Sequence, residues 1–251
     1  MDANVVALNR GYDQHFQARE QRLIDTLAGY GELLVCFSGR LESCYGMDLC
    51  RASGVRFRAV TLDNPTLSRN SVARARRYCQ HYGIPHQVIK TDEMIFSVHL
   101  GHLAEVTDPV RYLCRRLGQD GGPPILLSAS VEEMREYLRR FRSLPANTLW
   151  IFAEQGMTNR DFRYGFLKRQ LALWGSGGEA CLSWRFSDVS SLDRRHLHMV
   201  DMAEQMLFDM GLDGAQVFFH TLARVRVPQR MRALVFDMQP SIQKALQSAQ
   251  F

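Results

Sequence analysis

A short polar loop follows the first apolar run of the chain, and its composition suits phosphate binding. Residues 37–43 read FSGRLES and join a predicted strand, residues 33–37, to a predicted helix, residues 42–52. At the carboxyl end of a parallel strand, backbone N–H groups and a helix N-terminus point to where a phosphate can bind. The patterns GxxxxGKS/T and GxGxxG do not occur in this loop, which excludes a Walker A loop and a Rossmann fingerprint. An ordinary strand-to-helix turn and a phosphate loop of another type remain open.

The cysteines and histidines predict neither a metal centre nor a disulfide scaffold. Six cysteines are spread along the chain without a CxxC pair, so we expect reduced thiols and no zinc ribbon or thioredoxin-like motif. His99 and His102 are spaced i,i+3, but no cysteine or carboxylate completes a ligand set. Four cysteines fall within predicted strands or helices and are predicted core residues: Cys36, Cys44, Cys50 and Cys79.

The elements that position the loop follow an α/β pattern. Apolar runs alternate with helical stretches through the first two thirds of the chain, which is typical of a mostly parallel sheet. Strands are predicted at residues 33–37, 55–62, 86–89, 125–127 and 149–152. Helices are predicted at residues 13–28, 42–52, 68–82, 109–117, 131–141 and 158–174. We expect the first strand to be central and Ser68 to cap the third of these helices.

The pattern changes after the glycine-containing segment at residues 175–178, which is the predicted hinge. Beyond it we predict an amphipathic helix at residues 192–210, strands at residues 216–219 and 222–227, and helices that begin at Pro228 and Pro240. The chain therefore divides into an α/β sheet domain at residues 1–178 and a small C-terminal α+β domain at residues 179–251.

Composition limits the class of protein. With 46% hydrophobic and 23% charged residues among 251, the chain can bury a substantial core. Its apolar runs fall far short of the roughly 20 residues that span a bilayer, and residues 1–16 lack the apolar stretch of a secretory signal. We therefore expect a soluble, cytoplasmic protein with no membrane partner. The net charge of +5 comes with arginines scattered among acidic residues, which favours a solvated surface over a nucleic-acid interface.

The loop resembles the SGGxDS loop of the ATP-pyrophosphatase (PP-loop) superfamily, which grips the phosphates of ATP and releases pyrophosphate while a substrate is adenylated. Ser38, Gly39 and Ser43 match that motif, whereas Arg40 replaces its second glycine and Glu42 replaces its aspartate. A side chain at position 40 crowds the loop, and glutamate moves the carboxylate one methylene away from where it would orient Mg²⁺. Arg40 either supplies a guanidinium to the phosphates or occupies their place.

Further segments resemble, in chain order, the LarE family of ATP-dependent sacrificial sulfur transferases. Residues 59–67 (AVTLDNPTL) are similar to the family's AVTxxSPT, residues 86–93 (HQVIKTDE) to HxVIxTDE, and residues 111–115 (RYLCR) to RCYxCK with one cysteine missing. Residues 126–137 (LLSASVEEMREY) follow the shape of LDGTNADDLxDY, with acids at Glu132, Glu133 and Glu136. Residues 156–163, 180–185, 199–204 and 220–225 resemble GLTKAEIR, xCLASR, MVEEAE and HxxLARIE. The likeness covers nearly the whole chain.

The resemblance implies a PP-loop (adenine nucleotide alpha hydrolase-like) fold and an ATP-dependent reaction that forms AMP and pyrophosphate. ATP and Mg²⁺ are the implied cofactors, and a small-molecule carboxylate or nucleotide is the implied substrate. Sulfur comes either from a protein cysteine, which is left as dehydroalanine, or from an iron–sulfur cluster on three cysteines. Only Cys114 and Cys181 match family positions, which disfavours a cluster. The family's product feeds the nickel-pincer cofactor of lactate racemase, and we expect a homo-oligomer.

The resemblance also assigns roles residue by residue. Cys181 is the implied sulfur donor, and Arg185 is expected to stabilise its thiolate or the anionic adenylate. The implied nucleotide-binding residues are Ser38, Gly39, Arg40, Glu42 and Ser43, and the implied substrate-binding residues are Ser183, Glu204 and Arg224. Two alternatives stay open. One is a non-catalytic relative that binds a nucleotide or a protein partner. The other is tRNA thiolation, which would need a cysteine pair and an RNA-binding appendage that the sequence does not suggest.

Overall fold

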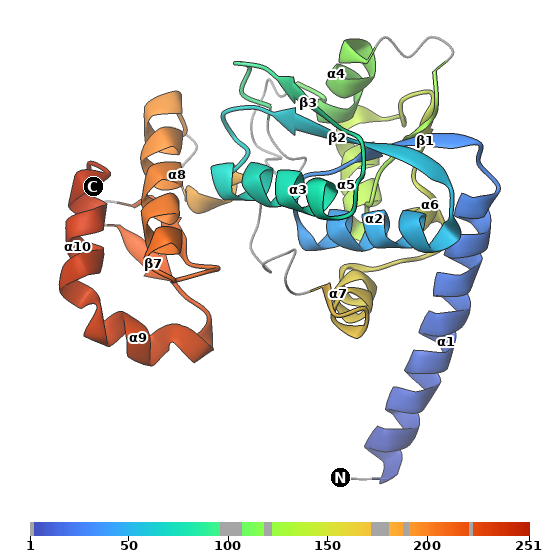
Figure 1. The fold of residues 1–251 in the computed structure, drawn as a ribbon, viewed down its shortest axis with the longest axis horizontal. Coiled ribbons are helices and arrows are strands. Elements are labelled where there is room, and N and C mark those ends of the chain that lie inside the picture. The colour runs from blue at the N-terminus through green and yellow to red at the C-terminus, as the bar shows by residue number, and fades with distance from the viewer. Residues whose placement is uncertain (1–2, 96–106, 118–121, 172–180, 188–190, 221–222) are drawn as a thin grey trace.

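Five parallel strands form the central sheet (Figure 1). The computed structural model describes residues 3–95, 107–117, 122–171, 181–187, 191–220 and 223–251. The strands are β1 (Glu32–Cys36), β2 (Arg56–Asp63), β3 (His86–Lys90), β4 (Ile125–Leu126) and β5 (Thr148–Leu149). They lie in the order β3-β2-β1-β4-β5, and every neighbouring pair is parallel. The predicted α/β class, the parallel sheet and the central first strand are confirmed.

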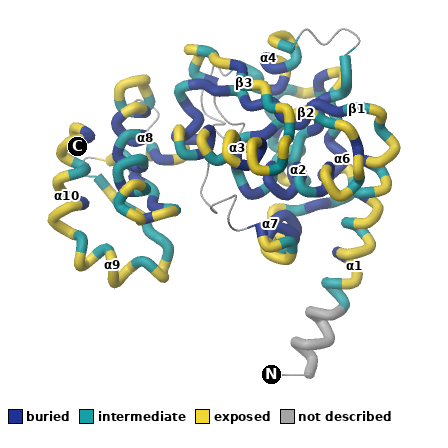
Figure 2. The backbone as a smooth tube through the Cα atoms, in the orientation of Figure 1, coloured by how far each residue is buried: buried dark blue, intermediate teal, exposed yellow. Residues whose placement is uncertain are grey.

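The sequence of β1 explains its central position. Its three middle residues, Leu33, Leu34 and Val35, are all buried, so both faces of the strand are covered, as expected in a parallel sheet. Leu33 and Val35 pack in the largest core cluster, while Leu34 packs in a second cluster on the other face. Figure 2 shows this burial running along the sheet and the helices against it. The strand order reverses between β1 and β4, where an open α/β sheet forms its ligand crevice.

Some of the helices around the sheet begin at a side-chain cap. The helices are α1 (Ala3–Ala28), α2 (Leu41–Ser53), α3 (Arg69–His81), α4 (Pro109–Arg116), α5 (Val131–Phe141), α6 (Ile151–Glu154) and α7 (Asn159–Lys168). Ser130 and Glu133 form a capping box at α5. Thr158 and Asp161 form a second one at α7. Asp108 accepts two backbone hydrogen bonds in the first turn of α4. None of the described helices is both long and apolar enough to cross a lipid bilayer.

The C-terminal part of the chain forms a small α+β unit beside α3 (Figure 1). Its elements are η2 (Leu182–Arg185), α8 (Arg194–Asp209), β6 (Gln216–Phe218), β7 (Arg224–Arg226), η4 (Gln229–Met231), α9 (Arg232–Asp237) and α10 (Gln239–Ser248). β6 and β7 fall within the two strands predicted for this end of the chain, and they pair antiparallel. Ala203, Val217 and Ile242 belong to a separate hydrophobic cluster that joins α8, β6 and α10.

One carboxylate joins this unit to the sheet. Asp201 on α8 accepts a hydrogen bond from the backbone N of Arg69, the first residue of α3, at 2.9 Å. Ser68 holds the predicted N-cap position, but its side chain makes no capping hydrogen bond to a described residue. Asp201 therefore caps α3 from another element. Burial raises the pKa of Asp201 to about 6, while the hydrogen bond and charge of Arg69 act in the opposite direction.

Several predicted boundaries need correction. α1 begins at Ala3 rather than at residue 13, and α7 ends at Lys168 rather than at residue 174. The predicted strand at residues 149–152 is wrong beyond Leu149, because Trp150 turns the chain with φ −112° and ψ 30° into α6. A short buried apolar run does not distinguish a strand from a helix. The predicted hinge at residues 175–178 lies outside the described residues, as do His99, His102 and Leu222.

Candidate functional site

The loop between β1 and α2 depends on a glycine. Gly39 has φ +74°, and a Cβ atom at this position would lie 2.4 Å from the backbone oxygen of Ser71 on α3. Both facts exclude an L side chain without rearrangement, so the match of Gly39 to the phosphate-loop motif has a structural reason. The loop therefore passes tightly over the N-terminal half of α3.

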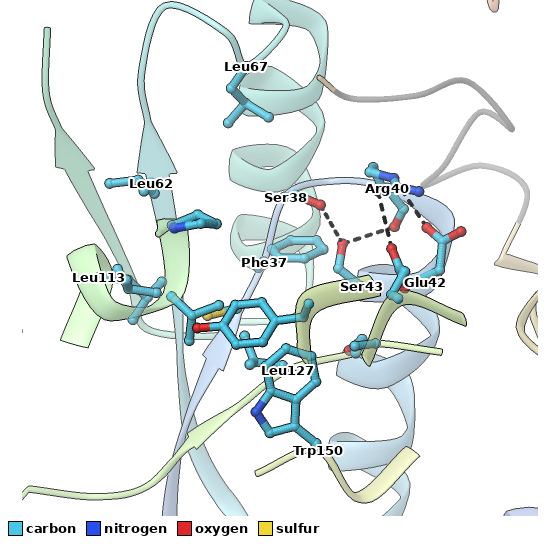
Figure 3. A pocket seen from close by; sticks show the side chains of 18 residues that line it. Phe37, Ser38, Arg40, Glu42, Ser43, Leu62, Leu67, Leu113, Leu127 and Trp150 are labelled. Atoms are coloured by element: carbon cyan, nitrogen blue, oxygen red, sulfur yellow. Dashed lines mark hydrogen bonds and ion pairs between the residues drawn. The ribbon is translucent and has the colours of Figure 1, made fainter. Parts of the chain in front are cut away.

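The two serines of the loop face each other across its turn (Figure 3). The hydroxyl oxygens of Ser38 and Ser43 lie 3.2 Å apart. The Ser43 hydroxyl donates to the backbone oxygen of Arg40 at 3.0 Å, and the backbone N of Cys44 donates to the same oxygen at 2.8 Å. Arg40 is the N-cap residue of α2, so these contacts hold the turn at the start of that helix.

A cavity of about 280 Å³ opens beside this loop, at the carboxyl ends of β1, β2 and β4 (Figure 3). Much of its wall is apolar and includes Phe37, Val60, Leu62, Leu113, Leu127 and Trp150. Its polar lining includes Ser38, Arg40, Glu42, Ser43 and Glu133. The volume is close to the lower end, roughly 300 Å³, of small-molecule pockets. An apolar wall suits a flat ring, and a polar rim at helix starts suits an anionic group.

The cavity forms at the reversal point of the sheet. Phe37 and Ser38 reach it directly after β1, and Leu127 and Ser128 reach it directly after β4. From β1 the sheet continues through β2 and β3 on one side, and through β4 and β5 on the other. The loops that follow β1 and β4 therefore diverge and leave a crevice between them. The location predicted from the sequence for a ligand site is thus the location of the cavity.

Arg40 lies between two carboxylates at the rim. Its Nε atom is 3.3 Å from Glu42 Oε2, and its Nη1 atom is 3.7 Å from Glu133 Oε1. Glu42 belongs to the first turn of α2 and Glu133 to the first turn of α5. The guanidinium therefore bridges the starts of two helices that come from opposite sides of the reversal point. The sequence marks Glu133 only as an acid that matches a family segment and gives it no site role.

Two groups of the pocket wall stay protonated at neutral pH. Burial, with a smaller contribution from neighbouring Cys114, raises the pKa of Cys36 to about 12. Burial and a hydrogen bond to Asp108 raise the pKa of Tyr137, whose hydroxyl donates to Asp108 Oδ2 at 2.5 Å. Neither group therefore offers an anionic nucleophile to a bound ligand.

Cys181 lies next to the pocket wall without lining the pocket itself. It forms an antiparallel β-bridge with Leu67, and Leu67 lines the cavity. The backbone N of Leu182 donates to the Thr66 oxygen at 2.7 Å, which fixes this contact. The Cys181 Sγ and Ser183 Oγ atoms are 2.8 Å apart, and both side chains are buried. The structure thus brings Cys181 and Ser183 together next to Leu67, which lies between Cys181 and the pocket.

Arg185 and Glu204 are paired with each other. Arg185 Nε donates to Glu204 Oε1 at 2.6 Å, and the same oxygen accepts a hydrogen bond from the backbone N of Val217 at 3.1 Å. Both side chains are buried, and they border a void of only about 30 Å³. Arg224, by contrast, is exposed on β7. Of the predicted substrate-binding residues, Ser183 contacts Cys181 and Glu204 contacts Arg185, whereas Arg224 lies on β7.

Comparisons with known proteins find only distant structural likeness. No protein-family model and no curated protein matches the sequence. The glutamine-dependent NAD+ synthetase from Acinetobacter baumannii, solved with ADP, matches with a TM-score of 0.37 and 16% identity over 48% of this chain and 27% of that chain. The NH3-dependent NAD synthetase from Campylobacter jejuni, solved with nitrate, matches with a TM-score of 0.35 and 16% identity over 47% of this chain and 58% of that chain.

The chain thus spans between about a quarter and three fifths of the length of these synthetases. A likeness this remote transfers no activity or ligand, so the function has to be argued from the geometry of the site.

Proposed function

We propose that the pocket beside residues 38–43 binds ATP, with the phosphates at the loop and the adenine against the apolar wall. The backbone of the loop and the start of α2 supply N–H groups for the phosphates, and Arg40 adds a positive charge. Phe37, Leu127 and Trp150 supply flat or branched apolar surface for the base.

The proposed reaction is LarE-like sulfur transfer, with Cys181 as the donor. The observation that carries it is the β-bridge between Cys181 and Leu67, because Leu67 lines the pocket. A shift of this one segment would expose the thiol to an acyl adenylate formed there. Cys181 also occupies the one xCLxxR position in the sequence.

The proposed sulfur transfer proceeds in three steps. A substrate carboxylate oxygen attacks the α-phosphorus of ATP, and pyrophosphate leaves. The Cys181 thiolate attacks the acyl carbon of the adenylate, and AMP leaves, so that a thioester forms. A base then removes the Cα proton of Cys181 and the Cβ–S bond breaks, which releases the thiocarboxylate and leaves dehydroalanine. The chain therefore loses the elements of hydrogen sulfide and acts once.

Non-catalytic nucleotide binding is the second candidate. The engagement of Arg40 by Glu42 and Glu133, and of Arg185 by Glu204, favours it, because the charged groups expected to act on ligands contact each other. In this case ATP binds at the same pocket and no pyrophosphate is released.

Intact-mass spectrometry separates the two candidates. The protein is incubated with ATP, Mg²⁺ and a pyridinium mononucleotide carboxylate, and pyrophosphate release is measured in parallel. Sulfur transfer predicts a mass loss equal to hydrogen sulfide that Cys181→Ala abolishes and Cys114→Ala leaves intact. Cys114 is a suitable control because it is a partly buried thiol at another family position. Loss of sulfur from another cysteine contradicts the assignment, and ATP binding without pyrophosphate release or mass loss supports the non-catalytic candidate.

A further inference from the structure

The rim of the pocket carries a positive charge from the protein itself, the guanidinium of Arg40. Arg40 is within ion-pair distance of Glu42 and of Glu133, and these two acids come from the first turns of different helices. All three side chains are about one-fifth exposed, so the cluster is neither free surface nor deep core. In Figure 3 the Arg40 side chain lies beside Glu42 at the loop, next to the paired hydroxyls of Ser38 and Ser43.

A magnesium ion does not fit this cluster as it is built. Mg²⁺ requires oxygen ligands in near-octahedral geometry at about 2.0–2.1 Å. Arg40 presents only N–H donors between the two carboxylates, which a metal would repel rather than bind. Glu133 Oε2 accepts the backbone N–H of Ser130 at 3.0 Å in the capping box, so this oxygen is also engaged. The residues present place a guanidinium where the implied metal would have to bind.

We infer that Arg40 serves in the place of a divalent cation and that this pocket binds the polyphosphate of a nucleotide without Mg²⁺. The inference rests on the proposed nucleotide site. A guanidinium offers a planar set of N–H donors that matches two phosphate oxygens, and it stays charged at any physiological pH. Glu42 and Glu133 orient it in the absence of ligand, as carboxylates orient a metal in other sites.

The inference reverses the expectation from the motif. By comparison with SGGxDS, the substitutions at positions 40 and 42 weaken the loop, and Arg40→Gly with Glu42→Asp should repair it. With Arg40 as the bound cation, the same double variant loses the positive charge and leaves two carboxylates facing the phosphates. Its nucleotide binding should become weak in EDTA and should recover with Mg²⁺, because the freed carboxylates then have a metal to bind.

Isothermal titration calorimetry with ATP tests this on the full chain, in excess EDTA and in Mg²⁺. The wild-type dissociation constants in the two buffers should agree within about twofold, and Arg40→Ala should weaken binding in EDTA by at least about tenfold. Arg163→Ala is the matched control, because Arg163 is an exposed arginine on α7 away from the pocket lining. Thermal unfolding of each variant shows whether it is folded, and the wild-type comparison decides the question even where a variant is not.

The possible outcomes separate the inference from the function on which it rests. Wild-type binding that requires Mg²⁺ overturns the inference and keeps the nucleotide site. Arg40→Ala that binds ATP in EDTA as tightly as the wild type also overturns it. No binding of ATP to the wild type in either buffer overturns the inference and the proposed function together.

Discussion

Two groups of charged residues in this protein differ in what surrounds them. Arg40, Glu42 and Glu133 border a cavity of about 280 Å³, whereas Arg185 and Glu204 border a void of about 30 Å³, roughly the volume of one water. The side chains of the second pair are 3% and 5% exposed, against about one-fifth for the first group. Charges beside open volume can exchange their partners for a ligand, while a buried pair holds elements together.

The comparison changes the expectation for the C-terminal residues. Arg185 and Glu204 match a family motif, but here they join η2, α8 and β6 through one carboxylate. We therefore propose the pocket beside β1 as the binding region, with the Arg185–Glu204 pair as a brace that positions the segment of Cys181.

The largest expected effect comes from breaking this brace. Glu204→Ala leaves the Arg185 guanidinium buried without its carboxylate and should lower the free energy of unfolding by about 3–5 kcal/mol. Urea denaturation measures this, and Arg224→Ala on the exposed face of β7 should change it by less than about 0.5 kcal/mol. The double variant Arg185→Met with Glu204→Leu should recover only part of the loss, because it removes the unpaired charge but also the oxygen that accepts from the Val217 backbone N. A Glu204→Ala protein that is as stable as the wild type but no longer transfers sulfur would instead indicate that this pair binds the substrate.

Gly39→Ala should produce the next largest effect, on stability and on binding together. The added Cβ meets the Ser71 backbone oxygen and the residue keeps φ +74°, so we expect a loss of about 2–3 kcal/mol and ATP binding weakened at least about tenfold. Gly31→Ala is the control, because a Cβ there meets nothing within 4 Å. Thermal unfolding and ATP titration report the two effects. Unchanged binding in a folded Gly39→Ala protein would remove this loop from the site.

The junction of α8 and α3 should make stability depend on pH. The folded-state pKa of Asp201 is raised to about 6, so between about pH 4 and 6 the folded chain holds a proton that the unfolded chain has released. Stability from this group is therefore present at low pH and falls by about 3 kcal/mol as pH rises through that window. Asp201→Asn keeps an oxygen for the Arg69 backbone N and should remove this dependence in urea titrations across the window. An identical profile in the variant would exclude Asp201 as the cause.

The smallest expected effect comes from comparing two substitutions that each remove a helix cap, one at the rim of the pocket and one away from it. Ser130→Ala and Thr158→Ala each break a capping box and should each cost about 1 kcal/mol. The Ser130 hydroxyl also accepts a hydrogen bond from the backbone N of Glu133, whose side chain contacts Arg40, so only the Ser130 variant should weaken ATP binding, by about threefold. Calorimetry that finds equal affinities for the two variants would mean that the orientation of Glu133 does not matter to the ligand.

The sequence predicted the scaffold of the site better than its contents. Buried apolar runs such as Leu33 to Val35 require a covered central strand, and a glycine at position 39 fits the tight passage over Ser71. Contacts between distant segments have no local signal. The pairing of Cys181 with Leu67 and the capping of α3 by Asp201 depend on how two units pack, which no motif spacing encodes. Ser68 illustrates this, since a good N-cap residue is replaced by a carboxylate from α8.

The role proposed for Arg40 likewise could not be predicted from the sequence. The motif comparison identified a substitution that either adds a phosphate ligand or blocks the site. Which of the two applies depends on the contact between Arg40 and Glu133. Glu133 lies on a helix almost a hundred residues further along the chain and reaches the loop only because β4 lies next to β1.

Hydrogen–deuterium exchange with and without ATP tests most directly the claim that the pocket beside β1 is the binding region. The account predicts that ATP slows amide exchange in residues 37–44 and 127–134 and leaves exchange in residues 182–186 and 216–218 unchanged. Protection concentrated around Arg185 and Glu204, or no protection anywhere at saturating ATP, would contradict it.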